Sequence, residues 1–400
     1  MPRRFKLPEF LLARPRLAAF ALLATFCSGF GQTFFISVFG EQLRATHDIS
    51  HTVYGSLYAG ATLIGGLLLL RGGVYIDRWP LHRITTASVL LLALGCLLTG
   101  LAWHSLILGL GFVLIRLGGQ GMMGQLGLTV AGRYFGAHRG KAVALAALGF
   151  PLSESILPAA AVFLMTRHGP AGAWIAAALL LVLVLLPLLR RLARHAARPQ
   201  HGMPEKEEKN NMVHYTRNET LRDPAFYRLM PALLITPFTV TGVLFHQSAI
   251  AEARGWSLSL VASAFTAFAV GHLLPLLTAG PLVDRHGARR CLPPALLPMV
   301  AGLFLLAAGD ADWVIFAYMG LTGMSLGLIS ITGGALWPER YGTRHLGAIR
   351  SMAQAVMILS TAVAPVLLGA MLDYGVSVSA LANTLAVMAI LSALLAATAR

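Results

Sequence analysis

Long apolar runs constrain this sequence more than any other feature. They extend for about 18 to 25 residues, which is the length at which a helix crosses a bilayer. Lipid offers no hydrogen bonds to a backbone, so only helices and closed β-barrels span a membrane. Barrel strands alternate apolar and polar residues, whereas these runs are apolar throughout. The sequence therefore predicts an all-α membrane protein.

The composition supports the same class. Hydrophobic residues make up 56% of the 400 residues and charged residues only 12%, with a mean hydropathy of +0.71. Soluble domains contain about 25% charged residues. A soluble chain of this length could not cover its surface with so few charges.

We expect twelve transmembrane helices in two pseudo-symmetric six-helix bundles. The first six spans lie near 17–40, 53–75, 84–103, 106–132, 141–166 and 171–189. The second six lie near 226–247, 258–282, 291–309, 312–336, 347–372 and 377–397. This pattern predicts an N-terminal bundle in 1–190, a polar cytoplasmic linker in 191–225 and a C-terminal bundle in 226–400.

The net charge of +15 comes with a strong bias in position. Only Arg44, Arg167 and Arg254 fall in odd-numbered loops, and Arg116 falls inside a span. The other Lys and Arg lie in the N-terminal tail, the even-numbered loops and the C-terminus, and this asymmetry is the positive-inside pattern. We therefore expect a multi-pass protein of the cytoplasmic (inner) membrane with both termini in the cytoplasm, and no nucleic-acid partner. The basic N-terminus leads into a span without an evident cleavage site, which predicts an uncleaved first helix.

No motif for a cofactor or a metal is evident. Cys27, Cys96 and Cys291 are too scattered for a disulfide framework or a metal site. The chain lacks the glycine-rich loop that cradles nucleotide phosphates. We expect no cofactor and no ATP hydrolysis by this chain.

One motif occurs twice, as "GVYIDRWPLHR" and "GPLVDRHGARR". A shift of 207 positions superposes Gly73 on Gly280, Asp77 on Asp284, Arg78 on Arg285 and Arg83 on Arg290. The same shift superposes Arg133-Tyr134 on Arg340-Tyr341, Leu152-Ser153 on Leu359-Ser360 and Pro158 on Pro365. A constant shift of six helices onto six helices predicts a parallel repeat about an axis along the membrane normal.

These motifs resemble the signature of the major facilitator superfamily between helices 2 and 3 and its second copy between helices 8 and 9. The first copy departs from the signature, because Tyr75 stands where Leu is usual and Trp79-Pro80 displaces the later Gly. The stretch "RYFGAHRGKA" is similar to the loop between helices 4 and 5 of that family. The resemblance implies a bacterial twelve-helix transporter in which two bundles rock around a central cavity.

The resemblance also implies a gating role for the repeated motif. Asp77 would latch onto the other half when the cytoplasmic side is closed, because a carboxylate stabilises a helix N-terminus and pairs with arginines. The alternative is that these residues are turn residues and positive-inside anchors. The gating candidates are Gly73, Asp77, Arg78, Arg83, Gly280, Asp284, Arg285, Arg289 and Arg290.

Two charged residues fall inside predicted spans, Arg116 in helix 4 and Glu154 in helix 5. Each charge at a bilayer centre costs at least about 2.5–3.5 kcal/mol and needs a reason. One hypothesis is a buried structural ion pair. The other makes Glu154 a proton carrier with Arg116 as its partner or as an anchor for an anion. "RLGGQG" resembles the helix 4 motif of the family, in which the arginine is often tied to proton coupling.

Other polar residues in the spans are candidates for the substrate cavity, although each could equally form a hydrogen bond between helices. His246 and His272 are alternative proton sites, since histidine titrates near neutral pH. The cavity candidates are Gln32, Tyr58, Gln120, Gln125, His246, Gln247, His272 and Gln354.

The sequence thus predicts a secondary active transporter that moves a small solute by alternating access and is coupled to protons. We favour a small organic anion such as a carboxylate, because an intramembrane arginine suits one. Proton-driven efflux of drugs or metabolites is the alternative, and a non-transporting sensor built on a transporter scaffold is a remote one. We expect no enzymatic activity. The expected partners are the solute, protons and the lipid bilayer, and we expect a monomer.

Overall fold

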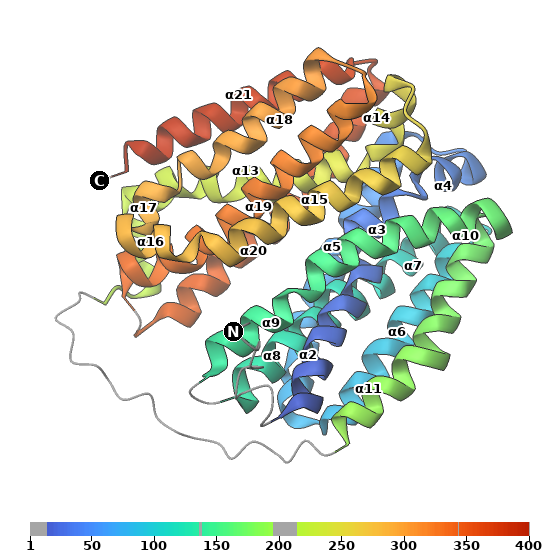
Figure 1. Cartoon of the computed structure of the whole chain (residues 1–400), viewed down its shortest axis with the longest axis horizontal. Helices are drawn as coiled ribbons and strands as arrows, with labels where there is room; N and C mark the ends of the chain where they lie inside the picture. The colour runs from blue at the N-terminus through green and yellow to red at the C-terminus, as the bar shows by residue number, and fades with distance from the viewer. Residues whose placement is uncertain (1–13, 136–137, 195–213, 343, 400) are drawn as a thin grey trace, which may run out of the picture. The chain divides into compact units, whose positions relative to one another are not determined.

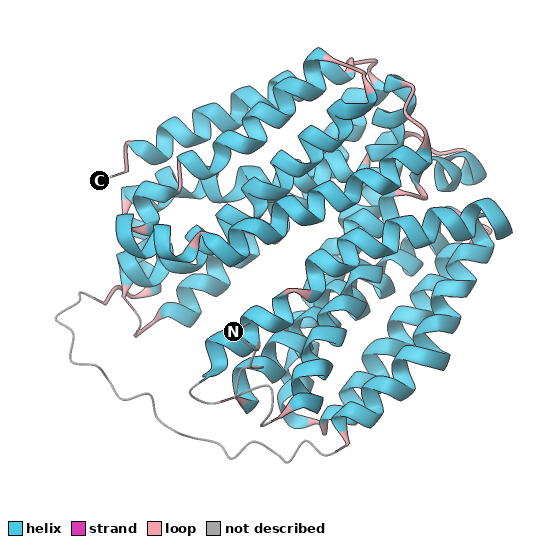
Figure 2. Cartoon of the chain, in the orientation of Figure 1, coloured by secondary structure: helices cyan, strands magenta, loops and turns pink. Residues whose placement is uncertain are grey.

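The computed structural model describes residues 14–135, 138–194, 214–342 and 344–399. Within these ranges the chain forms helices and connecting loops, and no strand occurs in them (Figure 2). Most of the predicted linker, 195–213, lies outside the described residues. The all-α architecture predicted from the apolar runs is confirmed.

Thirteen elements form the first half of the described chain, and Figure 1 shows their arrangement from blue to green. They are α2 (Pro15–Ser28), η1 (Gly29–Gly31), α3 (Thr33–Ser37), α4 (Gly40–His47), α5 (His51–Arg78), α6 (Leu81–Gly100), α7 (Ser105–Ile115), η2 (Arg116–Met123), α8 (Gly124–Tyr134), α9 (Arg139–Ala147), α10 (Gly149–Leu179), η4 (Leu180–Leu185) and α11 (Leu186–Ala193). Within this half α2 packs against α8 and α9, and α6 packs against α7 and α11.

Eleven elements form the second half of the described chain, coloured yellow to red in Figure 1. They are α12 (Arg217–Arg222), α13 (Pro224–Phe245), α14 (Gln247–Arg254), α15 (Leu258–Thr278), α16 (Gly280–His286), α17 (Ala288–Cys291), η5 (Pro294–Leu296), α18 (Leu297–Ala308), α19 (Asp312–Tyr341), α20 (Leu346–Asp373) and α21 (Val378–Ala397). Here α15 packs against α19, α18 packs against α19 and α21, and α13 packs against α20 and α21.

Eleven helical segments of the described chain are long and apolar enough to cross a membrane. One of them, Gly140–Ala193, has 54 residues and holds two of the predicted spans. The break between them is at Gly169, whose φ of 72° and ψ of 171° interrupt the helix. Glycine adopts a positive φ without the steric cost that a side chain brings. The segments therefore agree with the twelve expected spans.

The chain folds as two compact units that interleave along the sequence. Unit 1 comprises Met1–Phe35, Ile64–Ser153 and Phe163–Met203, and unit 2 comprises Ile36–Leu63, Glu154–Val162 and Pro204–Arg400. The segments 36–63 and 154–162 thus belong with the C-terminal helices, because they make the contacts described below. The domain boundaries expected from the sequence, 1–190 and 226–400, stay a prediction.

Small residues bring α15 and α19 close together in unit 2. A Cβ atom at Gly327 would lie 2.5 Å from the carbonyl oxygen of His272, and one at Gly271 would collide with the carbonyl of Gly320. Helices in lipid associate mainly by such close packing, since burial against lipid offers them little hydrophobic gain. The glycines of α15 and α19 therefore fix the position of α15 and of His272 on it.

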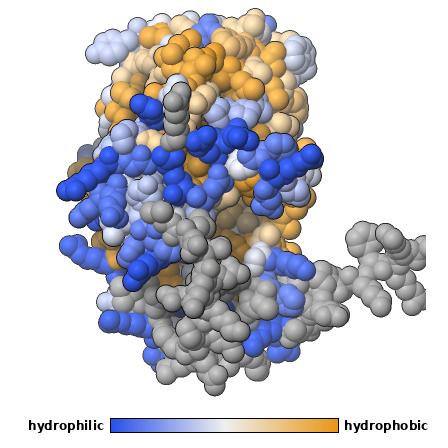
Figure 3. All heavy atoms as spheres, turned by 90° about the vertical axis from the view of Figure 1, so that its left-hand side faces the viewer, coloured by the Kyte–Doolittle hydropathy of each residue, from blue (hydrophilic) through white to orange (hydrophobic). Residues whose placement is uncertain are grey.

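Polar residues gather at the end of unit 2 where α16 and α17 lie. Asp284, Arg285 and Arg290 are exposed there. Figure 3 looks at this end, and hydrophilic residues form a band at the height of these two helices.

Serines cap helix starts elsewhere in the described chain. The Ser257 hydroxyl accepts from the backbone N–H of Leu260, at 3.2 Å. Such N-caps replace the hydrogen bonds that the first turn of a helix lacks.

Candidate functional site

A buried carboxylate and a buried imidazole meet in unit 2. The Nδ1 atom of His272, on α15, lies 3.1 Å and 3.0 Å from the two carboxylate oxygens of Glu154, on α10. Both residues are buried, with exposed fractions of 8% for His272 and 5% for Glu154. The contact is a salt bridge whenever the imidazole is protonated. With one shared proton the pair carries no net charge in the apolar interior, and release of that proton leaves one net negative charge on the pair.

Further contacts between α10 and α15 surround this pair. The ring of Phe268, one turn away on α15, lies 6.3 Å from the His272 ring. Ser155 follows Glu154 and donates to the hydroxyl of Thr266 on α15, at 3.4 Å. Together with the glycine packing between α15 and α19, these contacts position the Glu154 and His272 side chains next to each other.

Arg116 is buried in unit 1, where it is 3% exposed. One of its guanidinium nitrogens donates to the backbone carbonyl of Gly31, at 3.1 Å. Arg116 is the first residue of η2, which is a π-helical stretch. The fourth predicted span, 106–132, is therefore wound more loosely here than an α-helix. Such π-bulges occur frequently at functional sites. The expected pair of Arg116 with Glu154 stays a prediction, because the two residues belong to different units.

A close backbone approach accompanies Arg116. A Cβ atom at Gly31 would lie 2.5 Å from the carbonyl oxygen of Ile115, and one at Gly119 would lie 2.6 Å from the Cα of Gly31. Only glycine fits at this crossing of η1 and η2. The crossing brings the Gly31 carbonyl within reach of the Arg116 side chain.

Aromatic rings and a histidine form a second cluster in unit 2. Tyr58 and Tyr54, both buried on α5, pack on the ring of Phe245 with centroid distances of 4.4 Å and 4.5 Å. His246 follows Phe245, and its Nε2 lies 2.8 Å from the backbone carbonyl of Pro365 on α20. Tyr58 and His246, which the sequence offered as cavity residues, thus both contact the ring of Phe245.

The same region contains a cap that sequence reasoning missed. The carboxylate of Asp373, at the end of α20, accepts from the backbone N–H groups of His51 and Thr52 at 3.0 Å and 2.7 Å. These are the first N–H groups of α5, so Asp373 satisfies donors that no helical carbonyl can reach. Arg44 of α4 contacts the His51 ring at 2.7 Å. We name this group the Asp373 cap.

The five candidate glutamines belong to both units. Gln247 is buried, and its side-chain oxygen accepts from the hydroxyl of Tyr318 on α19. Gln32 is half-buried after η1, whereas Gln120 and Gln125 are exposed on η2 and α8. Gln354 is exposed on α20. The role of these glutamines in a substrate cavity stays a prediction.

The gating motif is described only in part. Gly73 and Asp77 lie in α5 but outside the residues whose side chains are described, and Arg78 and Arg83 are exposed. In the second copy, the carboxylate of Glu339 on α19 accepts from the backbone N–H of Ala288, at 2.6 Å. Glu339 thus caps α17, which begins within the motif at Ala288. The sequence analysis did not identify Glu339. The signal that could have found it is the scarcity of acidic residues, since the chain has only 16 Asp and Glu.

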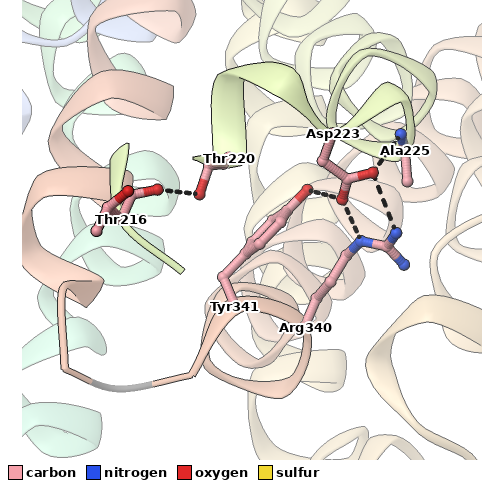
Figure 4. Close-up of polar contacts among 6 residues, drawn as sticks. All are labelled: Thr216, Thr220, Asp223, Ala225, Arg340 and Tyr341. Atoms are coloured by element: carbon pink, nitrogen blue, oxygen red, sulfur yellow. Dashed lines mark hydrogen bonds and ion pairs between the residues drawn. The ribbon is translucent and has the colours of Figure 1, made fainter. Parts of the chain in front are cut away.

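A polar clasp ties α13 to the end of α19 (Figure 4). Asp223 Oδ2 accepts from Arg340 Nε at 3.0 Å and from the Tyr341 hydroxyl at 2.9 Å, while Oδ1 accepts from the backbone N–H of Ala225 at 2.9 Å. Burial alone raises the pKa of Asp223, but the hydrogen bonds from Arg340, Ala225 and Tyr341 lower it, and the net pKa lies below its ordinary value. We name these residues the Asp223 clasp.

The first half contains a related contact. Arg14 precedes α2, and its guanidinium donates to the backbone carbonyl of Tyr134 at the end of α8, at 2.7 Å. Tyr134 and Tyr341 occupy equivalent positions in the predicted repeat. In both units, therefore, the residues before the first long helix bind the end of the fourth.

The sequence pattern of the Major Facilitator Superfamily matches residues 21–248 and 232–400. The chain belongs to this family of transporters. No curated protein matches the chain in a sequence search.

Two solved structures share its fold. One is a bacterial homologue of the human lysosomal transporter Spinster in an inward-facing, unoccupied conformation, with a TM-score of 0.67 and 16% sequence identity over 96% of this chain and 94% of that one. The other is a bacterial homologue of the same human transporter in an inward-facing, occupied conformation, with a TM-score of 0.63 and 16% identity over 96% of each chain. At this identity the likeness concerns the fold alone.

Proposed function

We propose that this chain is a secondary active transporter that couples the movement of a small organic anion across the cytoplasmic membrane to protons. It lies in that membrane with both termini in the cytoplasm, because its basic residues concentrate in the tail and the even-numbered loops. The family supplies alternating access, and the buried residues of this chain supply the coupling.

The Glu154–His272 pair is the observation that carries the proposal. Both side chains are buried and within 3.1 Å of each other. An intramembrane acid and base are costly and mark proton pathways. Opening the protein to one side hydrates the pair, and closing it dries the pair again. Because hydration favours charged forms, each half-cycle changes the proton affinity of the pair.

Transport into vesicles tests this proposal. Purified protein in vesicles with an imposed pH gradient is offered small carboxylates, lipophilic cations and neutral drugs. We expect gradient-driven accumulation of a carboxylate. Glu154→Gln abolishes accumulation but leaves counterflow exchange, because exchange needs no net proton movement. Glu252→Gln, an exposed acid on α14, is the matched control and keeps both activities.

Two results would contradict this account. A Glu154→Gln variant that still concentrates its substrate removes the residue from the coupling. Proton-driven extrusion of cations or neutral drugs, without carboxylate transport, favours an efflux pump instead.

A further inference from the structure

A cavity of about 380 Å³ lies between three helices of unit 2. Residues of α13, α19 and α20 line it, and all of them belong to the second half of the chain. Sites for small molecules typically have volumes of about 300–1,000 Å³ and are mostly apolar with a few polar groups. The cavity therefore has the size of a ligand site.

Its space comes from the backbone of α19. Gly333 and Gly334 are adjacent on the wall of the cavity. A Cβ atom at Gly333 would lie 3.1 Å from Leu233, whereas one at Gly334 would meet nothing within 4 Å. The missing side chain at Gly334 thus opens the space, and a large residue there would fill it.

The floor of the cavity is firmly built. Met230, Trp337 and Ala353 line it and also belong to a buried hydrophobic cluster with Tyr341 and Ile349. Tyr341 is part of the Asp223 clasp, which fixes the ends of α13 and α19. One side of the cavity is therefore formed by packed, buried side chains.

The polar groups of the lining favour an anion. Arg350 is the only charged residue among the lining residues, all of which the structure describes, and Gln354 lies one turn further along α20. The Arg350 guanidinium donates to the Gly334 carbonyl at 2.7 Å, which holds it at the cavity wall. A guanidinium carries five N–H donors, so this bond leaves others for a ligand. Apolar walls face it, among them Leu234, Ile329 and Met357.

We infer that this cavity binds an amphiphilic organic anion, with its acidic group on Arg350 and Gln354 and its apolar chain along α13 and α19. The inference rests on the proposed function and names its substrate class: a carboxylate that carries a medium-length hydrocarbon chain. Guanidinium and carboxylate form two parallel hydrogen bonds, which a neutral head group cannot reproduce. The hydrocarbon chain replaces water on the apolar walls, and each buried methylene tightens binding about fourfold.

Direct binding tests the site without any transport. The full chain in nanodiscs of phosphatidylcholine is titrated calorimetrically with acetate, hexanoate, octanoate and octanol, and empty nanodiscs are subtracted. We expect affinity to rise from acetate to octanoate. Arg350→Gln weakens octanoate at least tenfold and leaves octanol unchanged, while Gly334→Leu weakens both.

Two matched variants serve as controls. Arg344→Gln removes an exposed arginine that does not line the cavity, and Gly347→Leu adds the same side chain at an open glycine of α20. Both keep the wild-type affinity for octanoate. Equal losses in Arg350→Gln and Arg344→Gln, or octylammonium binding as tightly as octanoate, would overturn the inference.

A second arm identifies the source of the ligand. Nanodiscs that contain phosphatidylglycerol present an acidic lipid to the same cavity. Competition with octanoate that Arg350→Gln abolishes supports the anion site with a membrane lipid as its occupant, and absence of competition supports a free carboxylate. Octanoate binding without gradient-driven transport refutes the proposed function but keeps the site. Proton-driven transport of octanoate that Arg350→Gln and Gly334→Leu leave untouched refutes the site but keeps the function.

Discussion

The Asp223 carboxylate combines two roles, because it caps α13 and also binds Arg340 and Tyr341 of α19. Asparagine keeps the capping oxygen but loses the charge. Hydrogen bonds to charged groups contribute about 1.5–3 kcal/mol. We expect Asp223→Asn to destabilise the protein by about 1–3 kcal/mol, measured as a lower midpoint of thermal unfolding in detergent.

The pH dependence of this effect has a definite sign. The folded-state pKa of Asp223 is lowered, so its stabilisation is fully present above the unfolded-state value of about 3.9 and disappears as the pH falls through the folded-state pKa. The difference in unfolding midpoint between wild type and Asp223→Asn should therefore be constant from pH 7 to pH 5 and shrink below pH 4. A difference that grows on acidification would contradict the clasp.

His272 and Glu154 should behave as one unit. His272→Gln leaves a hydrogen-bond donor but no titratable base, so we expect it to abolish gradient-driven accumulation and to spare exchange, as Glu154→Gln does. Because the two residues share one function, the double variant should lose no more activity than either single variant. Losses that multiply in the double variant would assign the residues to separate steps.

The partner of Glu154 illustrates what sequence reasoning can resolve. A charged residue inside an apolar run stands out in the sequence because its burial in lipid is costly, and both Glu154 and Arg116 were found in this way. The partner depends on how α10 and α15 rotate about their axes, and 118 residues separate Glu154 from His272. His272 was predicted as a cavity candidate and as an alternative proton site, but not as the partner of Glu154. The Asp373 cap and Glu339 were missed because helix-end contacts to distant segments leave no local pattern.

At the scale of elements, α5 and α20 make a close backbone contact within unit 2, and we call this contact the seam. A Cβ atom at Gly55 would lie 2.5 Å from the Pro365 carbonyl, and one at Gly369 would lie 2.6 Å from the carbonyl of His51. The Asp373 cap closes the end of the same seam. In alternating access such a seam must part once in each cycle, so a glycine contact without interlocked side chains suits it.

We expect Gly55→Ala to force the seam open. Overpacking of this kind costs about 1–3 kcal/mol, which shifts a two-state equilibrium about 5- to 150-fold. The reporter is a cysteine at Tyr58, which is fully buried, probed with a membrane-impermeant maleimide. Gly60→Ala on the same helix is the control, since a Cβ atom there meets nothing within 4 Å. Equal labelling in the two variants would show that the seam does not move.

Helix boundaries show a similar limit of prediction. Hydropathy located the long apolar segments, because burial in lipid depends on composition over about 20 residues. Hydropathy did not predict that the fourth span contains the π-helical stretch η2 between α7 and α8. It also did not predict that the first span divides into α2, η1 and α3. Those departures arise where Gly31 and Gly119 let two backbones meet, and that is a property of the packed fold.

At the scale of the whole molecule, the repeat explains why two polar contacts occupy equivalent places. Arg14 binds the end of α8, and the Asp223 clasp binds the end of α19. The chemistry differs, with a backbone carbonyl as acceptor in one half and a carboxylate in the other. Each contact fixes the first long helix of its half to the fourth.

The twofold repeat also makes the topology testable. Six spans separate equivalent positions, so both halves must enter the membrane from the same side. Cysteines replace exposed residues one at a time, at Thr46 and Ala311 in odd-numbered loops and at His286 in an even-numbered loop, in a chain whose own three cysteines are changed to alanine. We expect an impermeant maleimide to label positions 46 and 311 in intact cells, and position 286 only after permeabilisation. Labelling of 46 and 286 from the same side would contradict the span count, because two complete halves cannot place an odd and an even loop together.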